Sequence, residues 1–450
     1  MRPKTIFGKD VMLGRYVMTD RPPVAIFRDY HRNSTFAIDQ PTVFKNILLC
    51  GGAGTGKTNV MNQILPQFRK WPEATQGFHI IFDTKGDYIR HRGFHRPGDY
   101  VIGNSPTFSR ISAVWNIFDE VLIDDGGKVP MEDDREHFYE INAREIAAVI
   151  FQDRGSKTQP FFANAARDIF ANTLIYFVRR YRDNYDKWHD KLNNAELKRF
   201  LLTWNAKDFA GFFNRYEDMR GLISYFGDGS SNQALGVFAE LRSMVYECFQ
   251  GIFALKAQNG PSFSVRRAVR EKGDKALFIE YDMAVGESLT PMYRLMVDLA
   301  LKEALSEHAN GRVHLYLDEL KLLPKVTHLQ DALNFGRSKQ VSVVAGIQNV
   351  DQIYATYGEY TAREILEGFG SVIAFKASDY STREYITRRY GPNVSAYRYY
   401  TESNTPVDHV REGNTIEHWQ QQELKTGQAF VGLASQTEPF FFHFEMDPYK

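Results

Sequence analysis

Residues 51–58 read Gly-Gly-Ala-Gly-Thr-Gly-Lys-Thr, which fits the pattern G-x-x-x-x-G-K-[ST]. A short apolar run at 46–50 precedes this loop, and a helix-forming stretch begins near Asn59. Glycines let backbone N–H groups approach phosphate oxygens without a Cβ clash. A buried strand, a glycine-rich loop and a helix in this order predict a P-loop that binds a nucleoside triphosphate.

The P-loop pattern also assigns individual roles. We expect Lys57 to reach the β- and γ-phosphates of ATP and Thr58 to hold Mg²⁺. An ordinary glycine-rich turn is the alternative, and the apolar strand in front of the loop argues against it. The predicted nucleotide-binding residues are Gly51, Gly52, Ala53, Gly54, Thr55, Gly56, Lys57, Thr58 and Asn59.

Composition indicates the size of the fold and excludes some kinds of binding site. The chain has 450 residues, of which 43% are hydrophobic and 14% aromatic, and this predicts a folded α/β core with a second domain. The formal net charge is zero, so any contact with DNA must come from a local surface. The two cysteines, Cys50 and Cys248, exclude a structural zinc site built on Cys.

The sequence gives no signal for export or for membrane insertion. No run reaches the roughly 18 consecutive apolar residues that indicate a membrane-spanning helix. The first residues, Met1 to Asp10, lack the apolar core of a signal peptide. We therefore expect a cytoplasmic protein.

Apolar runs and helical spacing together predict the domain organisation. Residues 1–40 suggest a small β-element, and an acidic loop at 124–136 interrupts the α/β pattern. Residues 137–257 have helical apolar spacing throughout, which predicts an all-α insertion of about five to seven helices. The predicted nucleotide-binding domain is 1–136 with 258–450. Its predicted strands follow one another as nearly continuous apolar runs at 46–50, 78–83, 276–281, 313–318, 341–347, 371–375, 427–433 and 440–444, which indicates a mostly parallel sheet covered on both faces.

A second motif supplies carboxylates. The run Leu315-Tyr316-Leu317-Asp318-Glu319 has the form of a Walker B strand, which brings two acids to the carboxyl edge of the sheet. We expect Asp318 to organise the Mg²⁺ shell and Glu319 to act as general base on the attacking water. The alternative is a strand that simply ends in two solvated acids.

Two more polar residues flank the strand predicted at 341–347. Gln348 follows it and could sense the γ-phosphate or position the water, while Arg337 precedes it and could act as an arginine finger on a neighbouring subunit. A strand-end cap and a solvated basic turn are the alternatives for these two residues.

Several motifs, in this order along the chain, resemble those of the coupling ATPases of conjugative type IV secretion, the TraG/TraD-type DNA-transfer motors. Residues 82–87 are similar to the family's Asp-Pro-Lys-Gly-Asp/Glu segment, and 115–118 to its Asn-Pro-Leu…Trp-Asn segment. Residues 317–319 match its Walker B motif. The most specific block is 336–353, which resembles the family's Gly-Arg-Lys…Gly-Xaa-Gln-Xaa-Xaa-Xaa-Gln-Leu run and is followed by Tyr357-Gly358.

This resemblance covers most of 40–445 and implies a RecA-like P-loop NTPase whose sheet is interrupted by an all-α domain. It also implies a homo-hexamer with DNA passing through its centre, and an arginine and a glutamine, here Arg337 and Gln348, that assist hydrolysis across the subunit interface. By analogy, the all-α domain would meet the relaxase–DNA substrate. Thr84 stands where the family has proline. Family members usually carry an N-terminal pair of transmembrane helices that this sequence lacks, which implies attachment at the inner membrane through a separate partner or a cytosolic motor.

The function that follows is an ATP-driven DNA translocase that links a DNA–relaxase substrate to a type IV secretion channel, with single-stranded DNA as the favoured form. One alternative is a cytosolic duplex-DNA pump of the cell-division or repair type. Another is an ATP-gated docking scaffold for secreted protein, which would hydrolyse ATP slowly and ignore DNA.

Two basic clusters are candidates for the DNA contact, because a translocase follows the phosphate backbone with Lys and Arg. One comprises Arg266, Arg267, Arg270 and Lys272, and the other comprises Arg179, Arg180 and Arg182 near Tyr176 and Tyr181. Solvated helix faces are the ordinary alternative for such charge runs.

Overall fold

The structure is a computed structural model that describes residues 21–31, 34–71, 77–90, 94–131, 137–154, 160–227, 229–258, 262–308, 311–400 and 406–446. The chain divides into two compact units. Unit 1 comprises Met1–Asp99, Gly273–Ala276 and Asn310–Lys450, and unit 2 comprises Tyr100–Lys272 and Leu277–Ala309. In the described part of the chain, no helix has both the length and the apolar character needed to cross a membrane.

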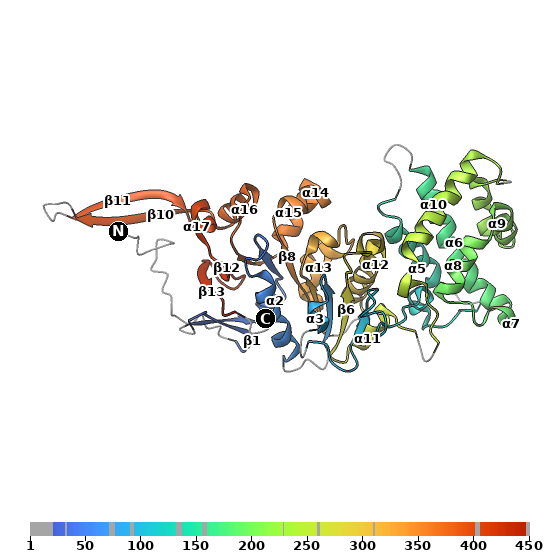
Figure 1. Cartoon of the computed structure of the whole chain (residues 1–450), viewed down its shortest axis with the longest axis horizontal. Helices are drawn as coiled ribbons and strands as arrows, with labels where there is room; N and C mark the ends of the chain where they lie inside the picture. Colours follow the sequence, from blue (N-terminus) through green and yellow to red (C-terminus); the bar gives the residue numbers. More distant parts are fainter. Residues whose placement is uncertain are drawn as a thin grey trace. The chain divides into compact units, whose positions relative to one another are not determined.

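Unit 1 is built around a sheet whose strands come from both ends of the chain (Figure 1). Its elements in chain order are β1 Pro23–Arg28, β2 Thr35–Asp39, α1 Gln40–Val43, β3 Ile47–Cys50, α2 Lys57–Arg69, β4 Phe78–Asp83, α3 Asp87–Arg90, β7 Val313–Leu317, the 3-10 helix η5 Leu320–Leu322, α13 Leu329–Phe335, η6 Gly336–Lys339, β8 Val341–Ile347, α14 Asp351–Tyr357, α15 Glu359–Glu367, β9 Ser371–Ala374, α16 Tyr380–Tyr390, β10 Pro392–Tyr400, β11 Pro406–Asn414, α17 His418–Glu423, β12 Gln428–Gly432 and β13 Phe440–His443.

The strands of unit 1 lie in the order β13-β12-β9-β3-β8-β7-β4. Strand β3 is parallel to both β8 and β9, with Ile47 opposite Val344 and Ser371. Strand β7 is parallel to β8 and to β4. Every residue of β3, β4, β7, β8 and β9 is buried, so both faces of this part of the sheet are covered, as the continuous apolar runs predicted.

The last two strands depart from this parallel arrangement. Strand β12 is antiparallel to β9, and β13 is antiparallel to β12. Only residues 433–439 connect β12 to β13, and a parallel pair would need a crossover of a dozen residues or more. The sheet is therefore mostly parallel with an antiparallel edge.

Five of the described strands do not follow a continuous apolar run, namely β1, β2, β5, β10 and β11. Strands β1 and β2 pair antiparallel and supply the described part of the β-element expected at 1–40, whose residues 1–20 lie outside the described residues. Strands β10 and β11 form a second antiparallel pair, which was not predicted because polar residues interrupt both segments. The three-residue strand β5, Tyr100–Ile102, is parallel to β6 and was too short to recognise.

Unit 2 is largely helical. Within the stretch expected to be an all-α insertion, 137–257, the described residues form helices α5 to α10 and two 3-10 helices. Part of the acidic loop expected at 124–136 falls outside the described residues, at 132–136. The elements of unit 2 are β5, α4 Ile117–Val121, η2 Ile123–Asp125, α5 Phe138–Ile150, α6 Phe161–Asp183, α7 Tyr185–Trp188, α8 Asn194–Thr203, α9 Ala206–Phe213, η3 Glu217–Tyr225, α10 Asn232–Cys248, η4 Gly251–Ala254, α11 Val265–Glu271, most of β6 Lys275–Glu280 and α12 Gly286–Leu305.

Candidate functional site

The glycine-rich loop joins β3 directly to α2, which begins at Lys57, two residues earlier than predicted. Gly51, Gly54 and Gly56 have φ values of 152°, 71° and 122°, a region that favours glycine. A Cβ on Gly51 would lie 2.8 Å from the Cβ of Phe375. The loop therefore needs its glycines both for backbone conformation and for close packing.

Lys57 points back into the loop. Its Nζ donates hydrogen bonds to the carbonyl oxygens of Gly51, at 2.6 Å, and Gly52, at 2.8 Å. Burial lowers the pKa of Lys57, while the nearby charges of Glu319 and Asp318 raise it. Two carbonyl oxygens of the loop itself thus hold the Lys57 cation.

Thr58 and Asp318 meet across the sheet edge. The hydroxyl of Thr58 donates to Asp318 Oδ1 at 3.2 Å, so the two predicted metal ligands are neighbours. Burial raises the pKa of Asp318, and the hydrogen bond from Thr58 opposes that rise. A Cβ on Gly346 would lie 2.2 Å from the backbone oxygen of Asp318, so only glycine lets β8 pack this closely against the end of β7.

Glu319 and Gln348 form the other half of the cluster. Gln348 Nε2 donates to Glu319 Oε2 at 2.9 Å. The second carboxylate oxygen, Glu319 Oε1, is buried and has no hydrogen-bond partner among the residues that the structure describes. Burial raises the pKa of Glu319, and the hydrogen bond from Gln348 lowers it. Gln348 therefore orients one carboxylate oxygen of Glu319, and the other stays without a hydrogen bond among the described residues.

Arg337 does not join this cluster. It lies in η6 at the amino end of β8, whereas Gln348 follows the carboxyl end of the same strand. The seven residues of β8 separate these ends by about 20 Å. The Arg337 side chain is exposed, and within the described part of the chain it forms no ion pair.

The turn after β4 also reaches this edge of the sheet. The sequence shows this turn only as part of a segment, 82–87, that resembles a family motif, and it predicts no role for Asp83. Asp83 is fully buried and accepts hydrogen bonds from the backbone N–H groups of Lys85, Asp87 and Ile89. Burial raises the pKa of Asp83 to about 6, and the backbone N–H groups of Ile89 and Lys85 oppose the shift. Asp83 thus shapes the loop that brings the charge of Lys85 near Lys57 and Asp318.

The residue that ends the predicted nucleotide-binding segment has a structural contact of its own. Asn59, in the first turn of α2, donates from Nδ2 to the backbone oxygen of Glu445 at 3.0 Å. The remaining predicted residues, Gly52, Ala53 and Thr55, lie in the loop as expected.

The first basic cluster is partly internal to unit 2, and burial contradicts a DNA contact for two of its four residues. Arg266 and Lys272 are each 3% exposed. Arg266 pairs with Asp124 at 2.7 Å and with Glu303 at 2.8 Å. Arg270 joins the same two acids. Because the acids lie far away along the chain, the sequence alone presents the arginines as a free basic run.

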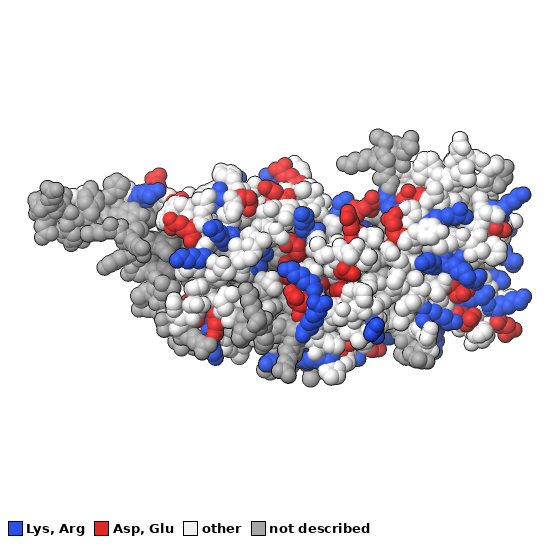
Figure 2. Space-filling view, viewed as in Figure 1, with Lys and Arg blue, Asp and Glu red and all other residues white. Residues whose placement is uncertain are grey.

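The second cluster is also largely neutralised. Arg179 pairs with Glu140 at 2.7 Å and with Asp218 at 2.8 Å. Arg180 stacks over the ring of Trp188, and Arg182 pairs with Asp183. Figure 2 shows lysine and arginine side chains interspersed with acidic ones over the region that Figure 1 labels α6 to α9.

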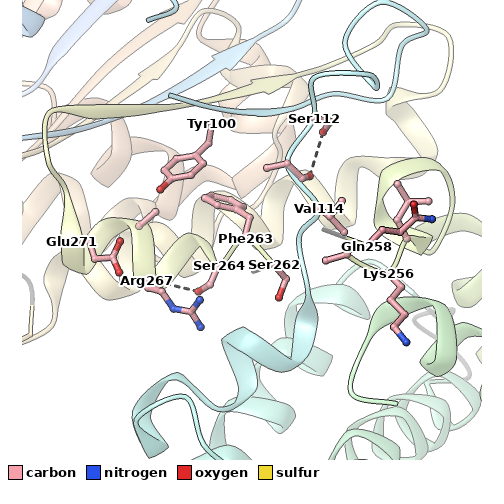
Figure 3. Close-up of a pocket in the computed structure, with 14 residues that line it drawn as sticks. Tyr100, Ser112, Val114, Lys256, Gln258, Ser262, Phe263, Ser264, Arg267 and Glu271 are labelled. Carbon is pink, nitrogen blue, oxygen red and sulfur yellow. Dashed lines mark hydrogen bonds between the residues drawn. The ribbon is translucent and has the colours of Figure 1, made fainter. Parts of the chain in front are cut away.

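Arg267 is the most exposed member of the first cluster. Its side chain is 36% exposed and lies 4.0 Å from Asp119. It lines a cavity of about 780 Å³ in unit 2 together with Lys256, Tyr100 and Phe263 (Figure 3). The rings of Tyr100 and Phe263 lie side by side, with centroids 4.6 Å apart. Aromatic surface and cations therefore meet in this cavity.

The family model described as the type IV secretion-system coupling protein DNA-binding domain matches residues 34–424. The chain belongs to this family. A curated relative, coupling protein TraD of Escherichia coli strain K12, is 23% identical over 384 residues, which are 83% of this chain and 48% of TraD. The coupling-protein chain described here thus spans about half the length of that relative.

Solved structures show the same fold. The conjugative coupling protein TrwBdeltaN70 in an unbound form gives a TM-score of 0.70 at 20% identity, covering 92% of this coupling-protein chain and 88% of the other. A structure of TrwB in complex with ADP and Mg²⁺ gives 0.69 at 20% identity, with the same coverage. The expected fold class, a P-loop NTPase of the RecA-like kind with a mostly parallel sheet, is confirmed.

Proposed function

We propose that this chain hydrolyses ATP with Mg²⁺ to move DNA, as a coupling ATPase that links a DNA–relaxase substrate to a type IV secretion channel. Membership of the coupling-protein family supports this proposal. The TraD coupling protein and the TrwB complex with ADP and Mg²⁺ support it as relatives in sequence and in fold. The arrangement of Lys57, Thr58, Asp318, Glu319 and Gln348 at one sheet edge supports the hydrolytic chemistry.

The observation that carries the proposal is the buried, unpartnered Oε1 of Glu319. A buried carboxylate oxygen without a hydrogen bond carries a desolvation cost, and such groups often mark a catalytic role. Gln348 fixes the other oxygen, so Oε1 keeps a defined direction. We infer that Oε1 accepts a proton from the attacking water.

The other residues of the edge fit a bound nucleotide and metal. Lys57 would exchange its two carbonyl partners for phosphate oxygens, and the loop N–H groups would hold the same anion. Thr58 and Asp318 offer the oxygen ligands that Mg²⁺ prefers. When bound, Mg²⁺ would neutralise charge on the transferring phosphoryl group.

Arg337 enters this proposal as a residue that acts on another copy of the chain. Because about 20 Å of strand separates Arg337 from its own Gln348, it does not serve its own site. Its exposure and lack of an ion pair among the described residues suit a group that completes a neighbouring site. We therefore propose a ring of identical subunits, with six as the expected number.

For the DNA contact we propose the cavity of unit 2 that contains Arg267. Single-stranded nucleic acid binds where cations follow the backbone and aromatic rings stack on bases. Tyr100, Phe263, Lys256 and Arg267 supply both in one place (Figure 3). Lys256 is 48% exposed and pairs weakly with Asp190 at 3.4 Å, so it remains accessible to a phosphate.

The test is the steady-state ATPase activity of wild type and Glu319→Gln, each measured alone, with single-stranded DNA and with duplex DNA. We expect single-stranded DNA to stimulate wild-type turnover, and we expect Glu319→Gln to bind ATP without turnover. Light scattering of the same samples would report assembly in the presence of ATP.

Two outcomes would favour other functions. Stimulation by duplex DNA alone, increasing with its length, would favour a cytosolic duplex-DNA pump. Slow turnover that ignores both DNA forms, with partner binding retained in Glu319→Gln, would favour an ATP-gated docking scaffold.

A further inference from the structure

The C-terminal segment of the described chain is tied to the P-loop at two places. The backbone N–H of Gly427 donates to the carbonyl oxygen of Thr55 at 2.9 Å. The side chains of Asn59 and Gln63, on α2, both donate to the carbonyl oxygen of Glu445, at 3.0 and 2.7 Å. Residues around 427 and 443–446 therefore border both the loop and the first turns of the helix that follows it.

An aromatic pair lies on this segment. The ring of His443 stacks on Tyr30, with centroids 4.6 Å apart and an interplanar angle of 12°. The backbone N–H of Tyr30 donates to the carbonyl oxygen of His443 at 2.7 Å, which fixes the two residues together. Tyr30 is nevertheless 50% exposed, so part of its ring faces solvent.

Gly427 connects this pair to the P-loop. A Cβ placed on Gly427 would lie 3.4 Å from His443 Cδ2 and 3.6 Å from the sulfur of Met446. The same residue approaches Gly56 closely, because a Cβ on Gly56 would lie 3.2 Å from the Gly427 nitrogen. Gly427 thus lies between the phosphate loop and the side chains of His443 and Met446.

A nucleotide bound by the P-loop must place its ribose and base beyond the phosphates. Because the loop N–H groups hold the phosphates, the base needs a flat apolar surface close to the loop. Aromatic rings and thioethers provide such a surface and tolerate any base, because every base has a π-face. On the described part of unit 1, Tyr30, His443 and Met446 offer this surface beside the loop.

We propose that Tyr30 and His443 form the stacking surface for the nucleobase of the nucleotide held by the P-loop, with Met446 at its edge. This inference rests on the proposed function, since it requires a nucleotide at the P-loop. Burial lowers the pKa of His443, so its imidazole is neutral near pH 7 and presents an uncharged ring. Recognition by stacking implies that ADP and GDP bind with similar affinity.

The experiment compares ADP with inorganic tripolyphosphate, which offers phosphates without a base. Binding of both is measured by calorimetry on the full chain for wild type, Tyr30→Ala, His443→Ala and Tyr30→Phe. We expect each alanine variant to bind ADP about 10-fold more weakly, because it loses a ring that stacks on the base, and to bind tripolyphosphate as wild type does. Tyr30→Phe keeps the ring and should keep wild-type affinity. Tyr360→Ala, which removes an 85% exposed tyrosine of unit 1 elsewhere, is the matched control.

Tripolyphosphate serves as the internal test of folding, because a variant that fails to fold loses both ligands. Lys57→Ala tests the P-loop site separately from the stacking surface. If it abolishes binding of both ligands while Tyr30→Ala and His443→Ala bind ADP within about twofold of wild type, the stacking surface is refuted and the P-loop site stands. If wild type binds neither ligand, the proposed function fails together with this inference.

Discussion

Gln348 Nε2 donates to Glu319 Oε2 at 2.9 Å, so the residue after β8 holds the carboxylate that follows β7. The two strands are parallel neighbours, and their carboxyl ends meet at the same edge. The orientation of the proposed general base therefore depends on a residue of the adjacent strand.

The first prediction concerns this contact. Replacing Gln348 with alanine should lower kcat for ATP hydrolysis by about 10-fold to 100-fold, because a misoriented base is costly in rate. ADP affinity should stay unchanged, since the side-chain hydrogen bond of Gln348 goes to Glu319 and not to the loop. Steady-state kinetics together with ADP binding would check both. Gln330→Ala, which removes an amide that bonds Glu364 near the surface, is the control and should behave as wild type.

A second prediction follows from the packing of β8 against β7. Gly346→Ala should destabilise the protein by about 1–3 kcal/mol, because the added Cβ would lie 2.2 Å from the Asp318 backbone oxygen. Denaturant unfolding would measure the change. Gly211→Ala, in the exposed face of α9 with no atom near its Cβ, should instead stabilise by up to about 1 kcal/mol. Equal effects of the two substitutions would contradict the close approach.

The third prediction tests action between subunits. Lys57→Ala and Arg337→Ala should each be inactive alone. Mixed together, they should recover part of the ATPase activity, because some sites would combine Lys57 of one chain with Arg337 of another. Activity of the mixture that equals the sum of the separate proteins would argue that Arg337 has no role in a neighbouring site.

The fourth prediction distinguishes the exposed Arg267 from the buried Arg266, both on α11. Arg267→Ala should weaken binding of single-stranded DNA and reduce the salt slope by about 1, with no change in DNA-free ATPase. Arg144→Ala, at an exposed position of α5, should leave DNA binding unaltered. Arg266→Met should act on stability instead, with a loss of about 3–5 kcal/mol, because it leaves Glu303 buried without one partner. Loss of DNA affinity in Arg144→Ala equal to that in Arg267→Ala would point to nonspecific charge.

The fifth prediction concerns two buried histidines. His314 Nδ1 lies 2.7 Å from Ser342 Oγ, and the His314 ring stacks on His79 at 5.0 Å. Burial lowers the pKa of His314 to about 3, and it lowers the pKa of His79 as well. At pH values below about 6.5, the ordinary pKa of histidine, these two side chains bind protons in the unfolded chain but stay neutral in the folded chain.

The free energy of unfolding should therefore fall as the pH drops below about 6.5, by up to about 1.4 kcal/mol per pH unit for each histidine. Denaturant unfolding at a series of pH values would measure this slope. His314→Gln should make it shallower, and the exposed His308→Gln should not. An unchanged slope in His314→Gln would assign the pH dependence to other groups.

The parts of the molecule that the sequence predicts well are those encoded by local pattern. The loop at 51–58 and the strand Val341–Ile347 are defined by neighbouring residues, so their structure needed no knowledge of partners. The sequence also predicts that Asp318, Glu319 and Gln348 lie close together, because each follows a strand and parallel strands end at the same carboxyl edge of the sheet.

The parts that escaped prediction depend on partners far along the chain. In the sequence, Arg266 and Arg270 suggest a basic surface. In the structure they form ion pairs with Asp124 and Glu303, which are distant in sequence. The contact of Gly427 with Thr55 depends on the antiparallel edge of the sheet, which apolar runs do not reveal.

The register of β3 has a consequence for biosynthesis. Ile47 leaves the ribosome early, yet its two strand partners, Val344 and Ser371, lie near the other end of the chain. The phosphate loop that follows β3 therefore lacks both flanking strands until β8 has been translated and lacks one of them until β9 has been translated, by which time the residues of unit 2 have all emerged. The last residues of unit 2 are therefore synthesised before β8 and β9, the two strands that enclose the P-loop strand of unit 1.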